Sequence, residues 1–164
     1  MKYEIARFAL SAVAALLLGR PTPVFAQDDN QGWNKLDSSF TLDTFVVNGC
    51  TGEQVHVVGH IDITMKTRVN PDGSTDIREQ DHAVGEGDGL TSGTQYRFNE
   101  LDVSDTSLGP NPDGTPFSFT ELRKQRVIGL GNTPNQRATF TLQLVIDANG
   151  NLLVDVQDFS LKCN

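Results

Sequence analysis

Residues 55–73 read VHVVGHIDITMKTRVNPDG, and this stretch decides the fold. Apolar side chains occupy its odd positions and polar ones most of its even positions, which is the period of a β-strand with one buried face. The odd set contains Val55, Val57, Ile61, Ile63, Met65 and Val69, and the even set contains His56, His60, Asp62, Thr64, Lys66 and Arg68. Gly59 interrupts the alternation, and a bend or a bulge would fit there.

Residues 70–73 supply the turn that ends this strand. Pro71 pre-sets the first central position of a type I turn, and Gly73 accepts the left-handed conformation of a G1 bulge. Asn70 should therefore face Ser74. This register predicts the pairs Arg68 with Asp76, Asp62 with His82, and Ile61 with Ala83.

The same kind of turn recurs at residues 147–150. With Asp147 opposite Asn151, the predicted pairs are all apolar: Ile146 with Leu152, Leu144 with Val154, and Leu142 with Val156. Beyond them the apolar parity switches to Phe159, Leu161 and Cys163. A bulge near Gln157 and Asp158 would account for the switch.

Further strands are expected at residues 40–47, 94–103 and 116–130, and no segment after residue 26 has a convincing helical period. The sequence therefore predicts an all-β fold, an antiparallel meander of about seven or eight strands. Long consecutive strands joined by tight turns favour a small barrel, with a two-sheet β-sandwich as the alternative.

The first 26 residues have the three zones of a secretory signal peptide. Lys2 and Arg7 are basic, residues 8–18 are apolar, and Ala26 is a suitable small residue for cleavage. This apolar run is much shorter than the roughly 20 residues that span a bilayer, which argues against a membrane anchor. We expect a cleaved leader at residues 1–26, a loose arm at 27–39 and a single β domain at 40–164.

Removal of the leader makes the net charge of the chain more negative. Ten basic and twenty acidic residues remain in the mature sequence. An acidic surface repels nucleic acid and anionic membranes, so we expect neither as a partner, and no later segment is apolar enough to insert into a membrane. The expected location is outside the cytoplasm, in a periplasm or beyond the cell, and the expected partner is a small molecule or another surface.

The mature chain contains two cysteines, Cys50 and Cys163. In an exported protein pairing is the default, and this pair would join the first strand region to the last. A catalytic thiol is the alternative, but no neighbouring His or Asn singles out either cysteine.

Three short segments carry a resemblance. Residues 50–53 (CTGE), 89–96 (GLTSGTQY) and 158–163 (DFSLKC) resemble a group of small secreted bacterial proteins of uncharacterised function. The likeness extends through most of the mature chain. It implies an exported, disulfide-bonded all-β protein, and it implies no activity, cofactor or catalytic residue.

Two carboxylates are the strongest hint of a site. The register set by residues 70–73 places Glu79 opposite Met65 and Asp81 opposite Ile63, on the apolar side of the sheet. Buried carboxylates are costly unless paired, and they often mark a functional site. They would line a polar cavity with Arg97 or Arg123 as counter-charge, unless a bulge between residues 77 and 83 turns them to solvent.

Other polar groups point to simpler roles. His60, Asp62 and His82 lie on the opposite face beside basic residues, which is typical of a solvated sheet surface. We predict no cofactor and no metal site. The leading interpretation is a non-enzymatic ligand-binding or structural component, with an aromatic pocket formed by Tyr96, Phe98, Phe117, Phe119 and Phe140. The alternative is a small barrel enzyme that uses Glu79 and Asp81.

Overall fold

The computed structural model describes residues 26–28 and 32–164, so the predicted leader at 1–26 lies almost entirely outside the described residues. The described part contains strands and no helix. The strands are β1 (Ala26–Asp28), β2 (Trp33–Asn48), β3 (Glu53–Val69), β4 (Thr75–Gly89), β5 (Gln95–Leu108), β6 (Phe117–Gly129), β7 (Gln136–Ile146) and β8 (Leu152–Cys163).

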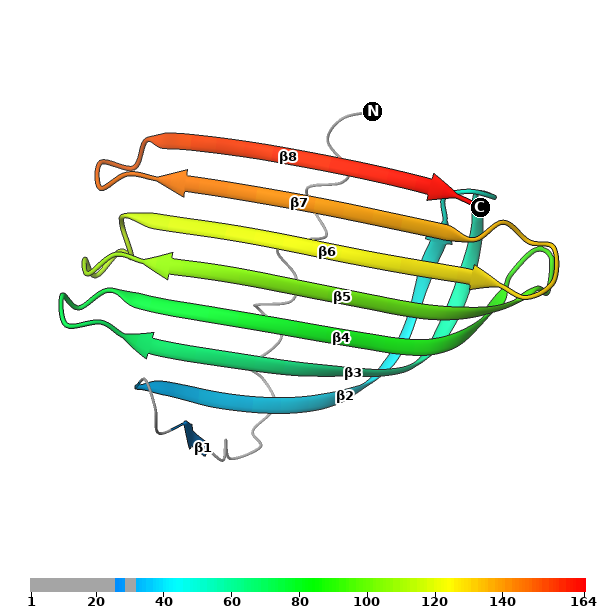
Figure 1. Ribbon diagram of the computed structural model, residues 1–164, viewed down its shortest axis with the longest axis horizontal. Coiled ribbons are helices and arrows are strands. Elements are labelled where there is room, and N and C mark those ends of the chain that lie inside the picture. The colour runs from blue at the N-terminus through cyan, green and yellow to red at the C-terminus, as the bar shows by residue number, and fades with distance from the viewer. Residues whose placement is uncertain (1–25, 29–31) are drawn as a thin grey trace.

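All eight strands form one antiparallel sheet in chain order, from β1 to β8 (Figure 1). The predicted all-β meander is confirmed. The predicted barrel is wrong, because β8 makes no ladder with β1 or β2 and the sheet remains open. The sandwich alternative is wrong as well, since all strands of the described residues belong to one sheet.

The register of β3 and β4 follows the turn at residues 70–73. Asn70 donates its backbone N–H to Ser74 O at 2.8 Å, and Gly73 has a positive φ of 86°. The ladder then pairs Arg68 with Asp76, Asp62 with His82, and Ile61 with Ala83, as predicted. The pairing continues through Gly59 without a register shift, so Gly59 marks a bend and not a bulge.

The last hairpin differs from the prediction in the position of its bulge. Ile146 pairs with Leu152 as expected, but the register shifts immediately, and Val154 faces Val145 instead of Leu144. Leu142 likewise faces Gln157 and not Val156. The irregularity is therefore at Leu153, next to the turn, and not at residues 157–158.

The predicted loose arm at residues 27–39 is wrong for its second half. Strand β2 begins at Trp33, and residues 34–39 pair without interruption with β3. Trp33 is buried although most of its neighbours are polar, because the guanidinium groups of Arg68 and Arg78 lie 4.7 and 5.0 Å from its ring centre. Such cation–π contacts stabilise an aromatic side chain on an otherwise polar face.

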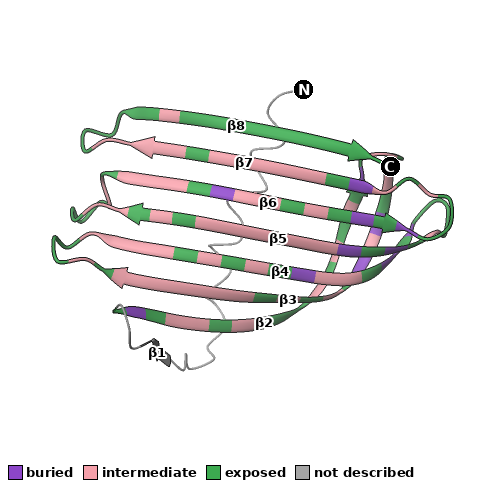
Figure 2. Ribbon diagram, viewed as in Figure 1, coloured by how far each residue is buried: buried purple, intermediate pink, exposed green. Residues whose placement is uncertain are grey.

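One face of the sheet, which we call the inner face, contains the core. Residues paired across a ladder share a face, and Val55, Val57, Ala83, Phe98 and Val127 are buried together on this side. Figure 2 shows the buried residues gathered mainly where the β2–β3 hairpin folds behind the other strands, and β8 exposed along almost its whole length. Close packing at the bend requires glycine, since a Cβ on Gly59 would overlap the carbonyl oxygen of Val84.

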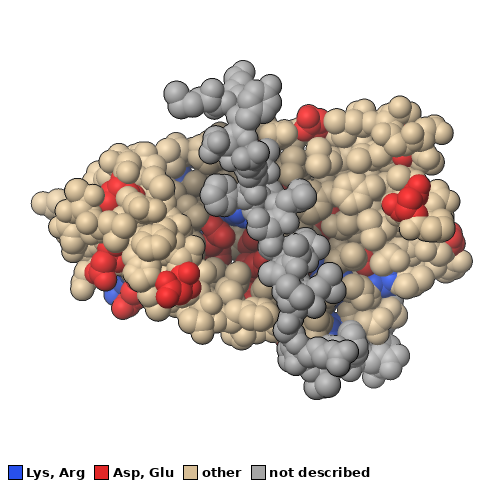
Figure 3. All heavy atoms as spheres, turned by 180° about the vertical axis from the view of Figure 1, so that it is seen from behind, with Lys and Arg blue, Asp and Glu red and all other residues tan. Residues whose placement is uncertain are grey.

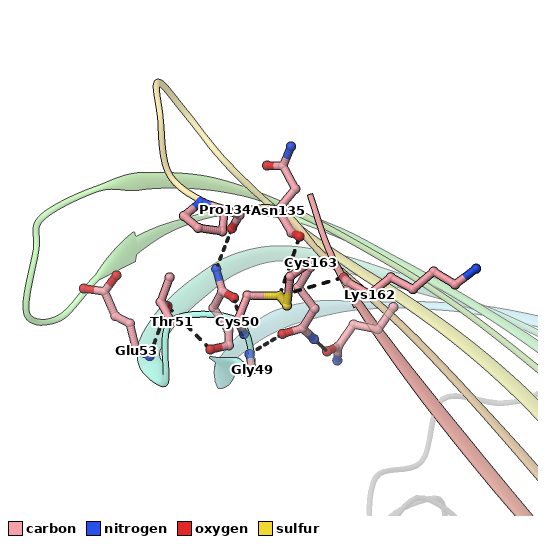
Figure 4. The surroundings of a disulfide bond; sticks show 11 residues. Gly49, Cys50, Thr51, Glu53, Pro134, Asn135, Lys162 and Cys163 are labelled. Atoms are coloured by element: carbon pink, nitrogen blue, oxygen red, sulfur yellow. Dashed lines mark hydrogen bonds between the residues drawn. A yellow bond between two sulfur atoms is a disulfide. The ribbon is translucent and has the colours of Figure 1, made fainter.

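The folded hairpin is fastened to the far edge of the sheet by the disulfide between Cys50 and Cys163 (Figure 4). Their Cα atoms are 5.6 Å apart, although 113 positions separate them in sequence. The adjoining turn also bonds to the β6–β7 loop and the start of β7: Asn48 Nδ2 donates to Pro134 O at 3.2 Å, and the Gly49 N–H donates to Gln136 Oε1. The expected pairing of the first and last strand regions is therefore present.

Candidate functional site

Charged side chains occupy the middle of the inner face, between the buried core and the opposite end of the sheet. Ladder pairing places Asp81, Asp102 and Arg123 in one row across β4, β5 and β6. Glu79 and Glu121 occupy the neighbouring row, on the same face. We call these five residues the inner cluster. Figure 3 shows acidic and basic side chains recessed in the middle of this face.

Arg123 is the cation of the inner cluster. Its Nε and Nη2 donate to Oδ2 of Asp102 at 2.9 and 2.7 Å. Nη2 also lies 3.0 Å from Glu121 Oε1, an ion contact without hydrogen-bond geometry. The side chains of Asp102 and Glu121 are only 15% and 5% exposed, so these charges interact in a poorly solvated environment.

The cluster contains more acceptors than donors. Oδ1 of Asp81, Oδ1 of Asp102 and Oε1 of Glu121 are buried, and none accepts a hydrogen bond within the described structure. Buried carboxylate oxygens are normally paired, and each unpaired one is destabilising. The inner cluster is therefore short of hydrogen-bond donors or protons.

Protonation of the carboxylates supplies some of the missing hydrogen-bond donors. Burial, followed by the negative charges of Glu79 and Asp102, raises the pKa of Asp81 to about 7 from an ordinary value of 3.8. Burial also raises the pKa of Glu79 and that of Glu121. A carboxyl group with a pKa near 7 exchanges its proton at physiological pH, so Asp81 could act as an acid or a base.

This proton makes stability depend on pH. Between about pH 4 and 7 the native state keeps the Asp81 proton and the unfolded state releases it, so the free energy of unfolding should fall as pH rises and level off above 7. Asp81→Asn should remove most of that slope and stabilise the protein at pH 8 on the order of 2 kcal/mol. Urea unfolding at pH 4.5 and 8 measures both effects. Parallel profiles for the wild type and Asp81→Asn would contradict them, and Glu86→Gln, on the exposed outer face, is the control.

The structure brings three of the four predicted site residues together. Glu79 faces Met65 and Asp81 faces Ile63, in the expected register, and Arg123 is the counter-charge. Arg97 does not belong to the inner cluster, because it alternates with the buried Tyr96 and Phe98 and lies on the outer face. There it lines two shallow hollows of about 520 and 550 Å³ together with Val58 and Glu86.

Asp102 and Glu121 were missed by the sequence reasoning. A signal exists for Asp102, since Tyr96, Phe98, Glu100 and Asp102 alternate along one side of β5. A similar signal exists for Glu121. Val127, Gln125, Arg123 and Glu121 are every second residue of β6, so they share the face of the buried Val127. Recognising either residue required the assumption that the apolar face continues through a run of charged positions.

A hydrogen-bonded chain links the inner cluster region to the disulfide-bonded turn. The Gly49 N–H donates to Gln136 Oε1, Gln136 Nε2 donates to Gln125 Oε1 at 2.9 Å, and Gln125 Nε2 donates to Glu100 Oε2 at 2.8 Å. Gln136 is only 4% exposed. The Gln125 amide therefore gives Glu100 a hydrogen-bond donor, whereas three carboxylate oxygens of the inner cluster have none.

Residues 50–53, residues 89–96 and Cys163 meet at the folded end of the sheet. Glu53 accepts hydrogen bonds from Thr91 N–H, from Ser92 N–H and Oγ, and from the Tyr96 hydroxyl, at 2.7 to 3.1 Å. The two Ser92 donors and Tyr96, with Thr91, lower the pKa of Glu53 to about 2. The disulfide joins residues 50 and 163 beside this contact. These contacts thus fasten one end of the fold, and none of them involves the inner cluster.

The histidines lie on the outer face. Asp62 faces His82 as predicted, and His60 Nε2 is 3.7 Å from Asp62 Oδ2, with both side chains more than half exposed. His82 Nε2 lies 3.0 Å from Asn99 Nδ2. Within residues 26–28 and 32–164, no group of three or more His, Cys, Asp or Glu side chains is placed to hold a metal ion.

Comparison with known proteins gives no match to a family model, a curated protein or a solved structure. The resemblance to small secreted bacterial proteins therefore stays a prediction. In the described part of the chain, no helix has the length and apolar character needed to cross a membrane.

Proposed function

We propose that this chain is an exported, non-enzymatic binding domain, and that the inner face of its sheet takes a small molecule with an apolar body and a polar group. Export with leader cleavage near Ala26 is part of the proposal, and the Cys50–Cys163 disulfide supports it. The proposal does not depend on a closed barrel.

One observation carries this proposal: a half-buried charged cluster lies among apolar side chains on a face whose β8 margin is exposed. Ile63 and Met65 flank the cluster on one side, from β3. Phe140 and Leu142 flank it on the other side, from β7. At the margin, Phe159 on β8 keeps 62% of its surface exposed. Apolar surface with a few convergent polar groups is the usual composition of a ligand site.

A neutral fluorescent probe, N-phenyl-1-naphthylamine, tests binding by the mature protein. We expect its fluorescence to rise on addition of the wild type. Phe159→Asp should weaken that binding about 10-fold, because it removes an apolar contact and places a strongly hydrated carboxylate where the apolar probe binds. The matched control is Phe45→Asp, because Phe45 is also about half exposed but lies on the outer face.

Two results would contradict the binding proposal. One is a wild-type protein that does not enhance the probe's fluorescence at concentrations up to its solubility limit. The other is an equal loss of binding in Phe159→Asp and Phe45→Asp, which would place the contact elsewhere or indicate general destabilisation. Thermal unfolding of both variants separates these last two cases.

The second candidate is an acid–base enzyme, and the raised pKa of Asp81 favours it. A carboxyl group with a pKa of about 7, next to Glu79, is suited to proton transfer at neutral pH. Such an enzyme should have a pH–rate profile with an inflection near 7 that disappears in Asp81→Asn. A turnover that survives Asp81→Asn unchanged would exclude this assignment.

A further inference from the structure

The inner face has a large excess of negative charge. Arg123 is the only Lys or Arg that ladder pairing places on the inner face of strands β2 to β8 in the described structure. Four carboxylates of the inner cluster surround it, and Glu100 lies beside them on β5. A ligand that completes this site should therefore bring positive charge.

The unmatched atoms are acceptors, which specifies the ligand further. Glu121 is 4% exposed, and its Oε1 accepts no hydrogen bond even though Arg123 is close. Oδ1 of Asp81 and Oδ1 of Asp102 are buried and equally without a donor. A group with several N–H donors would satisfy these oxygens, whereas an anion or a pure acceptor would not.

We propose that the inner cluster binds an organic cation, a primary ammonium or guanidinium group carried on an apolar body. This inference rests on the proposed function and names the ligand class of the same face. The surrounding Ile63, Met65, Phe140 and Leu142 suit the apolar body. The carboxylates are not placed to hold a metal ion in the described residues, which favours a hydrogen-bonding cation over a coordinated one.

Binding of such a cation should release a proton. The groups that face Asp81 are Glu79 on its own strand, Asp102 and Glu100 on β5, and Glu121 and Arg123 on β6, while β3 presents the apolar Ile63 and Met65. Only Arg123 among them is positive. A bound cation would take the place of the proton that Asp81 holds below pH 7, so affinity should rise with pH through that range.

Isothermal titration calorimetry with three eight-carbon probes tests the inference: octylammonium, octanoate and 1-octanol. We expect octylammonium to bind the mature wild-type protein at least about 10-fold more tightly than octanoate at pH 8, and about 10-fold more tightly at pH 8 than at pH 5.5. At pH 7, titrations in two buffers of different ionisation enthalpy should reveal proton release.

Variants then assign the binding to the inner cluster. Glu121→Gln and Asp81→Asn should each weaken octylammonium binding about 10-fold, because each removes a charged acceptor. Asp81→Asn keeps the test available if the buried Glu121→Gln does not fold. Glu86→Gln, which removes a carboxylate from the exposed outer face, should leave the affinity unchanged.

The outcomes separate this inference from the function on which it rests. Equal or tighter binding of octanoate or 1-octanol would overturn the cation inference and leave an apolar binding face in place. Octylammonium binding that Asp81→Asn and Glu121→Gln do not alter would also overturn it. If none of the three probes binds while N-phenyl-1-naphthylamine does, only the cation inference fails; if that probe fails too, both proposals fail.

Discussion

Replacing both cysteines by serine is expected to lower the free energy of unfolding by about 4 kcal/mol. The bond between Cys50 and Cys163 closes a loop of 113 positions, and a long loop restricts the unfolded chain strongly. The native state should lose order locally as well, because the turn beside Cys50 contacts the β6–β7 loop through Asn48 and the start of β7 through Gly49.

Urea unfolding of the mature protein measures this effect, with the reduced wild type as the matched control for Cys50→Ser/Cys163→Ser. Both should unfold at similar urea concentrations, well below the oxidised wild type. Hydrogen exchange should accelerate at residues 48–52 and 134–136 before the rest of the sheet. An unchanged midpoint, or a mature protein whose mass shows two free thiols before reduction, would refute the stabilising role.

Turn chemistry explains why the β3–β4 ladder was predictable to the residue. A tight turn with Pro71 and Gly73 permits one register, and that register places Glu79 and Asp81 on the inner face. The connection at residues 109–116 is longer, and the one at residues 90–94 contains no proline, so neither specifies a single register from sequence. A slip of one residue exchanges the two faces of a strand, so Asp102 and Glu121 could not be assigned in the same way.

Other features depend on contacts between distant segments. The parity of Phe159 and Leu161 requires an extra residue somewhere in β8, but any position between the turn and Phe159 restores it, and the structure places it at Leu153. Closure into a barrel requires the two edges of the sheet to meet, which local alternation does not specify. Here the turn of the β2–β3 hairpin is joined to the end of β8 by the Cys50–Cys163 disulfide. Strand β8 forms no ladder with β1 or β2, so the sheet stays open.

The strand at residues 34–39 also depends on contacts with a distant segment and could not be predicted from its own sequence. Their composition resembles a solvated arm, yet Leu36 pairs with Met65 and Ser38 with Ile63 on the inner face, while Lys35 and Asp37 form an ion pair on the outer face. The long strand β3 offers them a complete edge. Pairing with an existing strand thus determines the structure of a segment whose own propensity is weak.

Arg123→Met is expected to destabilise the protein by about 3 to 5 kcal/mol at pH 8, because it removes the counter-charge of buried carboxylates. Asp102 would lose both hydrogen bonds from the guanidinium, and Glu121 its only nearby cation among the described residues. Lowering the pH should reduce the cost, since the raised pKa values of Asp81, Glu79 and Glu121 allow protons to replace the missing charge.

Matched variants distinguish this charge effect from the loss of a long side chain. Arg97→Met changes the same residue type on the exposed outer face and should cost less than about 0.5 kcal/mol. Asp102→Asn combined with Arg123→Met should recover part of the loss at pH 8, because one unpaired charge is gone. Urea unfolding at pH 5 and 8 measures all four proteins. If Arg123→Met costs no more than Arg97→Met, or costs the same at both pH values, the inner carboxylates do not depend on Arg123 as their counter-charge.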